Sequence, residues 1–448
     1  MKFLFTARRA LFVSSLLLSS PVLLAQQASC CLETTATVRV PTGPAFNSFD
    51  MKVSPKKCVA ISEATSGKVF LYSLDEQTCA LDSQLKDTIL VPGARGLAFS
   101  PDGSCLAVSD YNRRVYIFRL NACGCTVNKK KSPQIFTFDA SAYPVAPRPF
   151  FATFSPDGNC LAVGLSARSE VALFKVSKKC CNFAGDPTLI STQGTANCSA
   201  GGDCVTGLAY SSNGSCLAVA NFASNSITLF KVDKCGCNLI TPGTVYPAVG
   251  AALPSFSSNG KCLAVTSNTT GILNIFSIKD CQATALPLQN NVLGRYGVAY
   301  STNGKCLLTT RLFDAVASYR VNKTSCSAIV QEAEPFIGAT SVAVNCSCVV
   351  ANGFALNPVQ LALRSYKLGC CPDALQGIPH LALSHDLRSA EELKLLNETD
   401  VLQGCHYNPE EKSEKKAEEN AAETKNSERN DSTGFLTSLF HGLKNLFS

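Results

Sequence analysis

Short apolar runs alternate with short polar turns along most of the chain. In the clearest unit, Gly96-Leu-Ala-Phe99 leads into Ser-Pro-Asp-Gly, and Cys105-Leu-Ala-Val108 follows the turn. Pro-Asp-Gly is typical of turns because glycine tolerates a positive φ. Two more apolar runs, residues 115–118 and 134–138, come after further turns. This order predicts a unit of four short antiparallel strands.

The unit recurs along the chain, with Asn-Gly replacing Asp-Gly in the later copies. The apolar–turn–apolar phrase covers residues 53–61, 99–108, 154–163, 210–219, 256–265, 300–308 and 344–351. A cysteine that opens the second strand marks the register of each copy, at intervals of 42 to 56 residues: Cys58, Cys105, Cys160, Cys216, Cys262, Cys306 and Cys348. One unit cannot bury both of its faces, so neighbouring units must stack. The period predicts an all-β protein, a seven-bladed β-propeller over residues 30–375.

The chain has 24 cysteines, and most of them follow the repeat. A second set comes just after the third strand of each unit: Cys79, Cys123/Cys125, Cys180/Cys181, Cys235/Cys237, Cys281, Cys326 and Cys370/Cys371. The start of strand two and the end of strand three share one edge of an antiparallel blade, so their sulfurs can meet. We therefore predict one disulfide within each blade, as Cys58–Cys79, Cys262–Cys281 and Cys306–Cys326 where the choice is unique.

The choice within the Cys-Gly-Cys and Cys-Cys pairs stays open, with Cys125, Cys180, Cys237 and Cys370 taken as the bonded members. A small loop in the insertion at 182–204 is predicted to close through Cys198 and Cys204. The alternative is metal binding by the paired cysteines. The repeats contain no His, and an oxidising compartment would oxidise thiols this close together. We therefore expect no metal site and no cofactor.

The first 25 residues resemble a secretory signal. Lys2, Arg8 and Arg9 precede an apolar run over 10–24, and small residues for cleavage follow. Its serines and Pro21 make the run poor for a membrane anchor, which is one alternative. Lipidation at Cys30 is another. A signal peptide and cysteines in repeat phase predict a secreted, periplasmic or extracellular protein.

A strand-like run at 34–40 precedes the first unit. A propeller is a closed ring, and closure removes an exposed sheet edge. This run is predicted to be the outer strand of the last blade, beside residues 359–366, which would bring Cys30 and Cys31 near Cys370 and Cys371.

The β pattern stops after about residue 375. Residues 376–407 predict a short helical extension, with Ser389 as a helix cap. Residues 408–432 are almost free of apolar residues, which predicts a disordered charged linker. Residues 433–448 predict a short amphipathic helix with Phe and Leu on one face. Two occupants of that face stay open: a protein groove, which includes docking on the propeller itself, or peripheral contact with a membrane.

Charge adds little to this picture. Lys and Arg number 40 against 33 Asp and Glu, a net charge of +7 that falls to +4 without the signal. No concentrated basic block lies inside the repeats, so we expect no nucleic-acid partner.

The repeats resemble two propeller families. The Ser-Pro-Asp-Gly-x-x-Leu-Ala-Val element is similar to WD40-like secreted repeats, although the chain has no Trp. The unit over 211–232 resembles YVTN and lactonase-like seven-bladed propellers. In the lactonase-like family a Gly-Pro-Arg-His element precedes the first strand of a blade. Here it corresponds to Gly93-Ala-Arg95-Gly96, so the Arg remains and the His is absent.

Two functions follow from these features. The first is a secreted, disulfide-stabilised scaffold that binds another protein or a cell surface without catalysis. The alternative is a lactonase-like hydrolase that uses the central channel. All four His residues lie beyond the repeats, so no catalytic residue is assigned. Arg95, Arg148 and Arg295 precede first strands and are candidate anion ligands at the channel mouth; the other interpretation is surface arginines on loops. The sequence leaves the partner and the oligomeric state open.

Overall fold

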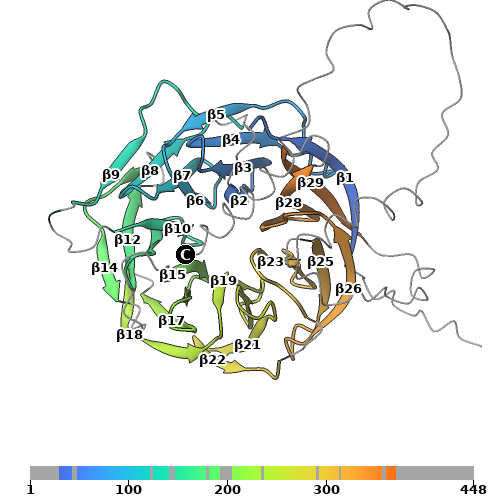
Figure 1. The fold of residues 1–448 in the computed structure, drawn as a ribbon. Helices are drawn as coiled ribbons and strands as arrows, with labels where there is room; N and C mark the ends of the chain where they lie inside the picture. Colours follow the sequence, from blue (N-terminus) through green and yellow to red (C-terminus); the bar gives the residue numbers. More distant parts are fainter. Residues whose placement is uncertain are drawn as a thin grey trace, which may run out of the picture.

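The computed structural model describes residues 30–42, 48–121, 125–139, 141, 147–177, 181–191, 204–233, 237–288, 292–311, 314–355 and 360–369. Within these residues all regular structure is β-strand, arranged as seven sheets. Figure 1 shows the sheets standing side by side as blades around a central axis. The predicted seven-bladed β-propeller is therefore confirmed. The predicted signal peptide at 1–25, helical extension, charged linker and amphipathic helix all lie outside the described residues.

Blades 1 to 4 follow one another along the chain. Blade 1 consists of β2 (Ser48–Val53), β3 (Cys58–Glu63), β4 (Lys68–Ser73) and β5 (Asp87–Leu90). Blade 2 consists of β6 (Ala94–Phe99), β7 (Cys105–Asp110), β8 (Arg114–Arg119) and β9 (Gln134–Thr137). Blade 3 consists of β10 (Pro149–Phe154), β11 (Cys160–Leu165), β12 (Glu170–Ser177), β13 (Asn182–Phe183) and β14 (Thr188–Ser191), with both short strands on the edge of β12. Blade 4 consists of β15 (Val205–Tyr210), β16 (Cys216–Asn221), β17 (Ser226–Asp233) and β18 (Asn238–Pro247).

Blades 5 to 7 complete the ring. Blade 5 consists of β19 (Ala251–Phe256), β20 (Cys262–Ser267), β21 (Asn274–Lys279) and β22 (Gln282–Ala285). Blade 6 consists of β23 (Val298–Tyr300), β24 (Cys306–Arg311), β25 (Ala315–Val321) and β26 (Ala328–Pro335). Blade 7 consists of β27 (Ser341–Asn345), β28 (Cys348–Ala355), β29 (Gln360–Gly369) and β1 (Cys31–Arg39).

Blade 7 closes the ring with strands from distant parts of the chain. The N-terminal strand β1 pairs antiparallel with β29, and Cys31 lies opposite Gly369. This confirms that the N-terminal run is the outer strand of the last blade. Pairing of this kind gives β29 a partner on its outer edge.

The apolar core lies between the blades. Seven buried clusters each join two neighbouring blades. Alternate residues of a second strand face opposite neighbours: Leu106 and Val108 pack towards blade 1, whereas Ala107 packs towards blade 3. Every residue of β7 is therefore buried, which explains why its sequence is apolar without a polar face.

The seven disulfides with both cysteines in the described residues join different blades, so the predicted pairings of a strand-two cysteine with the cysteine after strand three of its own blade are wrong. Each strand-two cysteine bonds to the cysteine after strand three of the next blade: Cys58–Cys125, Cys105–Cys181, Cys160–Cys237, Cys216–Cys281 and Cys262–Cys326. Cys306–Cys30 joins blade 6 to β1 of blade 7, and Cys348–Cys79 joins blade 7 to blade 1. All seven junctions between neighbouring blades are therefore bridged.

The physical reason is the register within the blade. Cys58 lies opposite Ser73 at the end of the third strand. Cys79 lies six residues after Ser73, has a φ of 57° and belongs to the connection that leads to the outer strand, so it is not the cross-strand neighbour of Cys58. Cα–Cα separations of 5.1 to 5.7 Å across the observed bridges suit disulfide geometry. Cys181, rather than the predicted Cys180, bonds to Cys105. Cys31 and Cys204 are also disulfide-bonded. Cys180, Cys198 and Cys370 lie outside the described residues.

Hydroxyl groups add polar contacts between blades. Ser62 Oγ donates to the carbonyl oxygen of Arg95 at 2.6 Å, and Thr266 Oγ1 donates to that of Tyr296 at 2.9 Å. Both hydroxyls lie on second strands and both acceptors belong to the next blade, so each pair satisfies buried polar groups at a blade junction.

Candidate binding surfaces: the channel and the two faces

The strand order defines two faces of the ring. First strands begin and second strands end at one face, which we call the open face. Second strands begin and third strands end at the other, which carries the seven interblade disulfides and which we call the disulfide face.

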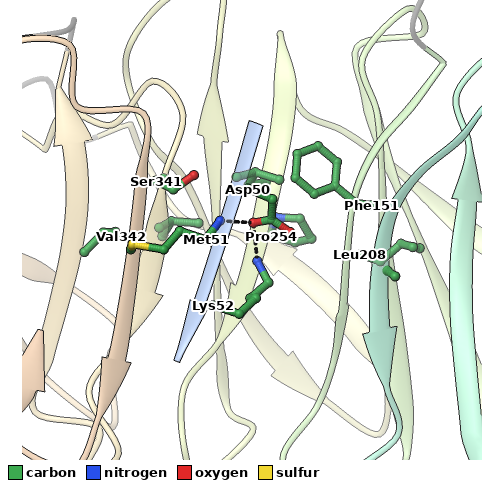
Figure 2. Close-up of a pocket in the computed structure, with 12 residues that line it drawn as sticks. Asp50, Met51, Lys52, Phe151, Leu208, Pro254, Ser341 and Val342 are labelled. Atoms are coloured by element: carbon green, nitrogen blue, oxygen red, sulfur yellow. Dashed lines mark hydrogen bonds and ion pairs between the residues drawn. The ribbon is translucent and has the colours of Figure 1, made fainter. Parts of the chain in front are cut away.

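The innermost strands surround a narrow channel. Asp50, Met51 and Lys52 of β2 face apolar side chains that include Phe151, Leu208 and Pro254 (Figure 2). The cavity measures about 50 Å³, which is room for a few water molecules.

Asp50 is the buried acid of this channel. Its carboxylate accepts hydrogen bonds from Lys52 Nζ at 2.7 Å and from the backbone N–H groups of Met51 and Leu97 at 2.9 Å each. The dashed lines of Figure 2 mark the contacts to Met51 and Lys52. Burial raises the pKa of Asp50, and the charge of Lys52 opposes that rise. The bond to Leu97 crosses to blade 2, so Asp50 helps to hold two inner strands together.

Two of the three candidate arginines meet at the open face. The Arg95 guanidinium carbon lies 3.2 Å from the ring centroid of Phe49 and 4.6 Å from that of Tyr111. Arg148 Nη1 donates to the Tyr111 hydroxyl at 3.0 Å, and its guanidinium carbon lies 4.9 Å from the same ring. Phe150 packs edge-on against Phe49 and Tyr111. Cation–π contact thus gathers blades 1, 2 and 3 around Tyr111.

Arg295 lies elsewhere on the ring. Its Nε donates to Asn268 Oδ1 at 3.3 Å, and its guanidinium carbon is 5.8 Å from the Tyr296 ring. Phe49 and Tyr111 were not among the site residues predicted from the sequence. They could have been predicted, because residues at the start of a first strand, such as Phe49, and residues directly after a second strand, such as Tyr111, lie at the same face.

The position after Arg95 has no room for a side chain. A Cβ added to Gly96 would collide with the carbonyl oxygen of Phe150 and lie 2.8 Å from Ser109 Oγ. The histidine that the lactonase-like resemblance places after the arginine therefore does not fit at Gly96.

Two further buried acids stabilise turns at the open face. Asp110 accepts from the backbone N–H of Asn112 and of Arg114, and Arg114 Nε donates to it at 2.8 Å. Glu63 accepts from the backbone N–H groups of Thr65 and Ser66. Both carboxylates are occupied in holding the turn between strands two and three.

The lysines gather at the disulfide face. All exposed lysines among the described residues lie there, and every blade contributes at least one: Lys56, Lys57, Lys129, Lys130, Lys131, Lys175, Lys231, Lys261, Lys279, Lys305, Lys323 and Lys367. We call this set the lysine ring. Within the described residues, two of these lysines form ion pairs, Lys57 with Glu76 and Lys129 with Asp87.

The described part of the chain holds no cluster of three or more His, Cys, Asp or Glu placed to bind a metal ion. In the same residues, no helix has the length and apolar character needed to span a membrane.

Comparisons with known proteins show the fold. No protein-family model matches the chain, and no curated protein matches it in sequence. The β-propeller domain of Cps50 (Swd1) from Myceliophteria thermophila is similar with a TM-score of 0.54 at 13% identity, covering 75% of this chain and 100% of that one. A proposed 6-phosphogluconolactonase from Bacteroides uniformis gives a TM-score of 0.55 at 15% identity, covering 67% and 90%. At such identities the likeness establishes that this chain is a seven-bladed β-propeller and carries no activity with it.

Proposed function

We propose that this protein is a secreted, disulfide-stabilised β-propeller that binds a partner protein or a cell surface without catalysing a reaction. The observation that carries the proposal is the covalent ring. Seven disulfides bridge all seven blade junctions and leave two broad faces formed by loops and turns. Loops on a rigid frame are where propellers bind their partners.

The stabilisation that these bridges give to the folded state suits a protein that works outside the cell. Five of them join residues 64 to 77 positions apart. Loop-closure entropy alone assigns about 4 kcal/mol to a bridge of that span. Disulfides form and persist in oxidising surroundings, which supports secretion.

A lactonase-like hydrolase is the second candidate. Arg95 and Arg148 both contact Tyr111 at the open face, and two guanidinium groups near a channel mouth suit an anionic substrate. Against it, the channel acid Asp50 already accepts three hydrogen bonds, and Gly96 has no space for the family's histidine. The scaffold is therefore the better supported function.

Capture of a partner tests the scaffold proposal. The protein with intact disulfides is immobilised and exposed to solubilised surface material from host or cultured cells. It is expected to retain a specific partner. The same protein reduced and alkylated serves as the control and is expected to lose it. Equal retention by both forms, or by neither, would contradict the proposal.

A further inference from the structure

We propose that the disulfide face binds a sulfated polysaccharide, and that lysines of blades 5 and 6 form the centre of the site. The inference rests on the scaffold function proposed above and names its partner. We call Lys261, Lys279, Lys305 and Lys323 the lysine arc.

The exposed lysines lie on the disulfide face, and several arginines packed against aromatic rings lie on the open face. The lysine ring is exposed, whereas open-face arginines such as Arg95, Arg148 and Arg295 are half-buried against aromatic rings. Arginine in such positions holds blades together. Lysine on a flexible stem is a hydrated point charge that attracts anions from solution. Among the described residues, most exposed cations therefore lie on the disulfide face, and Arg39 of β1 is exposed on the open face.

Disulfides fix the backbone of the lysine arc. Within the Cys262–Cys326 bridge, Cys326 Sγ lies 3.4 Å from the carbonyl oxygen of Lys261, and Cys262 Sγ lies 4.0 Å from that of Lys323. At the next junction, Cys30 Sγ lies 3.6 Å from the carbonyl oxygen of Lys305. These lysines therefore extend from a covalently held edge, which lowers the entropy lost when a ligand binds across several of them.

In the turn between strands one and two, the blades of the arc carry Asn where blades 2 and 3 carry Asp; the turn after β21 keeps one exposed acid, Asp280, beside Lys279. In blade 3, Asp157 Oδ1 accepts from Ser155 Oγ and from the backbone N–H of Asn159. In blade 5, Asn259 Oδ1 accepts from Ser257 Oγ at 2.8 Å and from the backbone N–H of Lys261 at 3.0 Å.

Asn303 does the same in blade 6, where it accepts from Ser301 Oγ and from the backbone N–H of Lys305. The amide keeps the turn and removes the negative charge. The four lysines of the arc form no ion pair among the described residues, so their charges face solvent.

The surroundings of the arc favour a polysaccharide over other polyanions. The exposed large apolar residues of the described chain are aliphatic, so this face has no exposed ring for stacking bases, as single-stranded nucleic acids require. Ile329 stands alone at the rim of blade 6, whereas insertion into a membrane needs a continuous apolar face. A sulfated sugar chain needs only spaced cations, which the arc supplies.

The test measures binding of the full chain to size-defined heparin at several salt concentrations. The arc variant carries Lys261→Gln, Lys305→Gln and Lys323→Gln. The control variant carries Arg39→Gln, Lys68→Gln and Arg113→Gln, which removes the same charge from the open face. The arc variant is expected to bind heparin about tenfold more weakly. The slope of log association constant against log salt concentration is expected to decrease in magnitude by about two to three. The control is expected to stay within about twofold of the unmodified protein.

Three results overturn the proposal: no heparin binding by the unmodified protein, equal weakening by both variants, or lysine-dependent binding to phosphatidylserine vesicles in place of heparin. Thermal melts of both variants exclude loss of folding as the cause. Capture of a protein partner without heparin binding would overturn this inference alone and leave the scaffold function standing.

Discussion

Glycine in the inner strands sets how closely neighbouring blades approach. Gly96, Gly207 and Gly297 hold equivalent positions, two residues before the Ala of Gly-Leu-Ala or Gly-Val-Ala. A Cβ at Gly297 would lie 2.6 Å from the backbone nitrogen of Val342, and the other two glycines meet a carbonyl oxygen of the next blade. The sequence places these glycines in or next to a first strand, but only the contacts with the adjacent blade explain why glycine is needed there.

Replacing Gly96 by Ala tests this close approach. The added methyl group must push the Phe150 backbone away, so Gly96→Ala is expected to lower the free energy of unfolding by about 1–3 kcal/mol. Chemical denaturation without reductant measures it. Gly369→Ala is the matched control, because nothing lies within 4 Å of a Cβ there. Equal effects of the two changes would contradict the packing argument.

Residue-scale chemistry also predicts the outcome of a lactonase assay. The purified protein is expected to show no lactone hydrolysis above background, because Gly96 replaces the histidine of the lactonase-like element and a side chain there would collide with the backbone of Phe150. Release of acid from a panel of lactones is the measurement. Turnover that Arg95→Ala abolishes would establish the hydrolase instead.

At the scale of the element, each blade gives one sulfur to each neighbour. Blade 2 bonds to blade 1 through Cys125 and to blade 3 through Cys105. Sequence spacing predicted which cysteines reach the same edge but assigned them to the same blade. Spacing could not decide, because both positions recur with the same period and the neighbouring blade offers an equivalent sulfur.

Peptide mapping checks this connectivity. Proteolysis under non-reducing conditions is expected to yield peptides that link Cys58 to Cys125 and Cys262 to Cys326. Tandem mass spectra before and after reduction identify them. A Cys58–Cys79 peptide as the main product would restore the pairing within the blade.

Two glutamates on the outer strand of blade 6, near β1, are expected to make the stability of the protein depend on pH. Glu332 Oε2 accepts from the backbone N–H of Leu32 at 2.6 Å. Burial raises the pKa of its neighbour Glu334, and repulsion from Glu332 raises it further. The folded chain therefore keeps this proton at a pH where the unfolded chain has lost it. Stability is lost as the pH rises from about the ordinary value of 4.5 through the raised pKa.

Glu334→Gln is expected to remove that loss. Between pH 4 and pH 7 the unmodified protein should lose stability relative to the variant as the pH rises, measured by denaturant unfolding at several pH values. Glu33→Gln removes one charge from an exposed site on β1 and serves as the control. A constant difference between Glu334→Gln and the unmodified protein would count against the assignment.

At the scale of the molecule, the ring is closed twice. The β1–β29 pairing closes it with backbone hydrogen bonds, and the Cys30–Cys306 and Cys79–Cys348 bridges close it covalently on both sides of blade 7. A single break in the chain therefore leaves the blades connected.

A cleavage experiment measures this property. A protease site inserted between Gly185 and Asp186, in an exposed turn of blade 3, is spanned by Cys160–Cys237 and by both bridges of blade 7. The cleaved protein is expected to run as one species on non-reducing gels, to keep its circular dichroism spectrum, and to separate into two fragments after reduction. Separation without reductant would show that the bridges do not cross the cut.

The fold class, the number of blades and the place of the N-terminal strand could all be predicted from the sequence. These follow from local signals that repeat: turn residues, alternating apolar runs and a cysteine in constant register. A strand that pairs at the end of a closed ring has few alternatives, so β1 could be placed as well.

The contacts between neighbouring blades, in contrast, could not be predicted from the sequence. The disulfide partners, the Arg95–Tyr111–Arg148 cluster and the glycine contacts all depend on how one blade stacks on the next. Stacking brings together residues from different repeats. Because equivalent residues recur in every repeat, their spacing alone does not show which of them are in contact. Arg95 and Arg148 meet at Tyr111 because they belong to the adjacent blades 2 and 3, whereas Arg295, at a similar position in its own unit, belongs to blade 6.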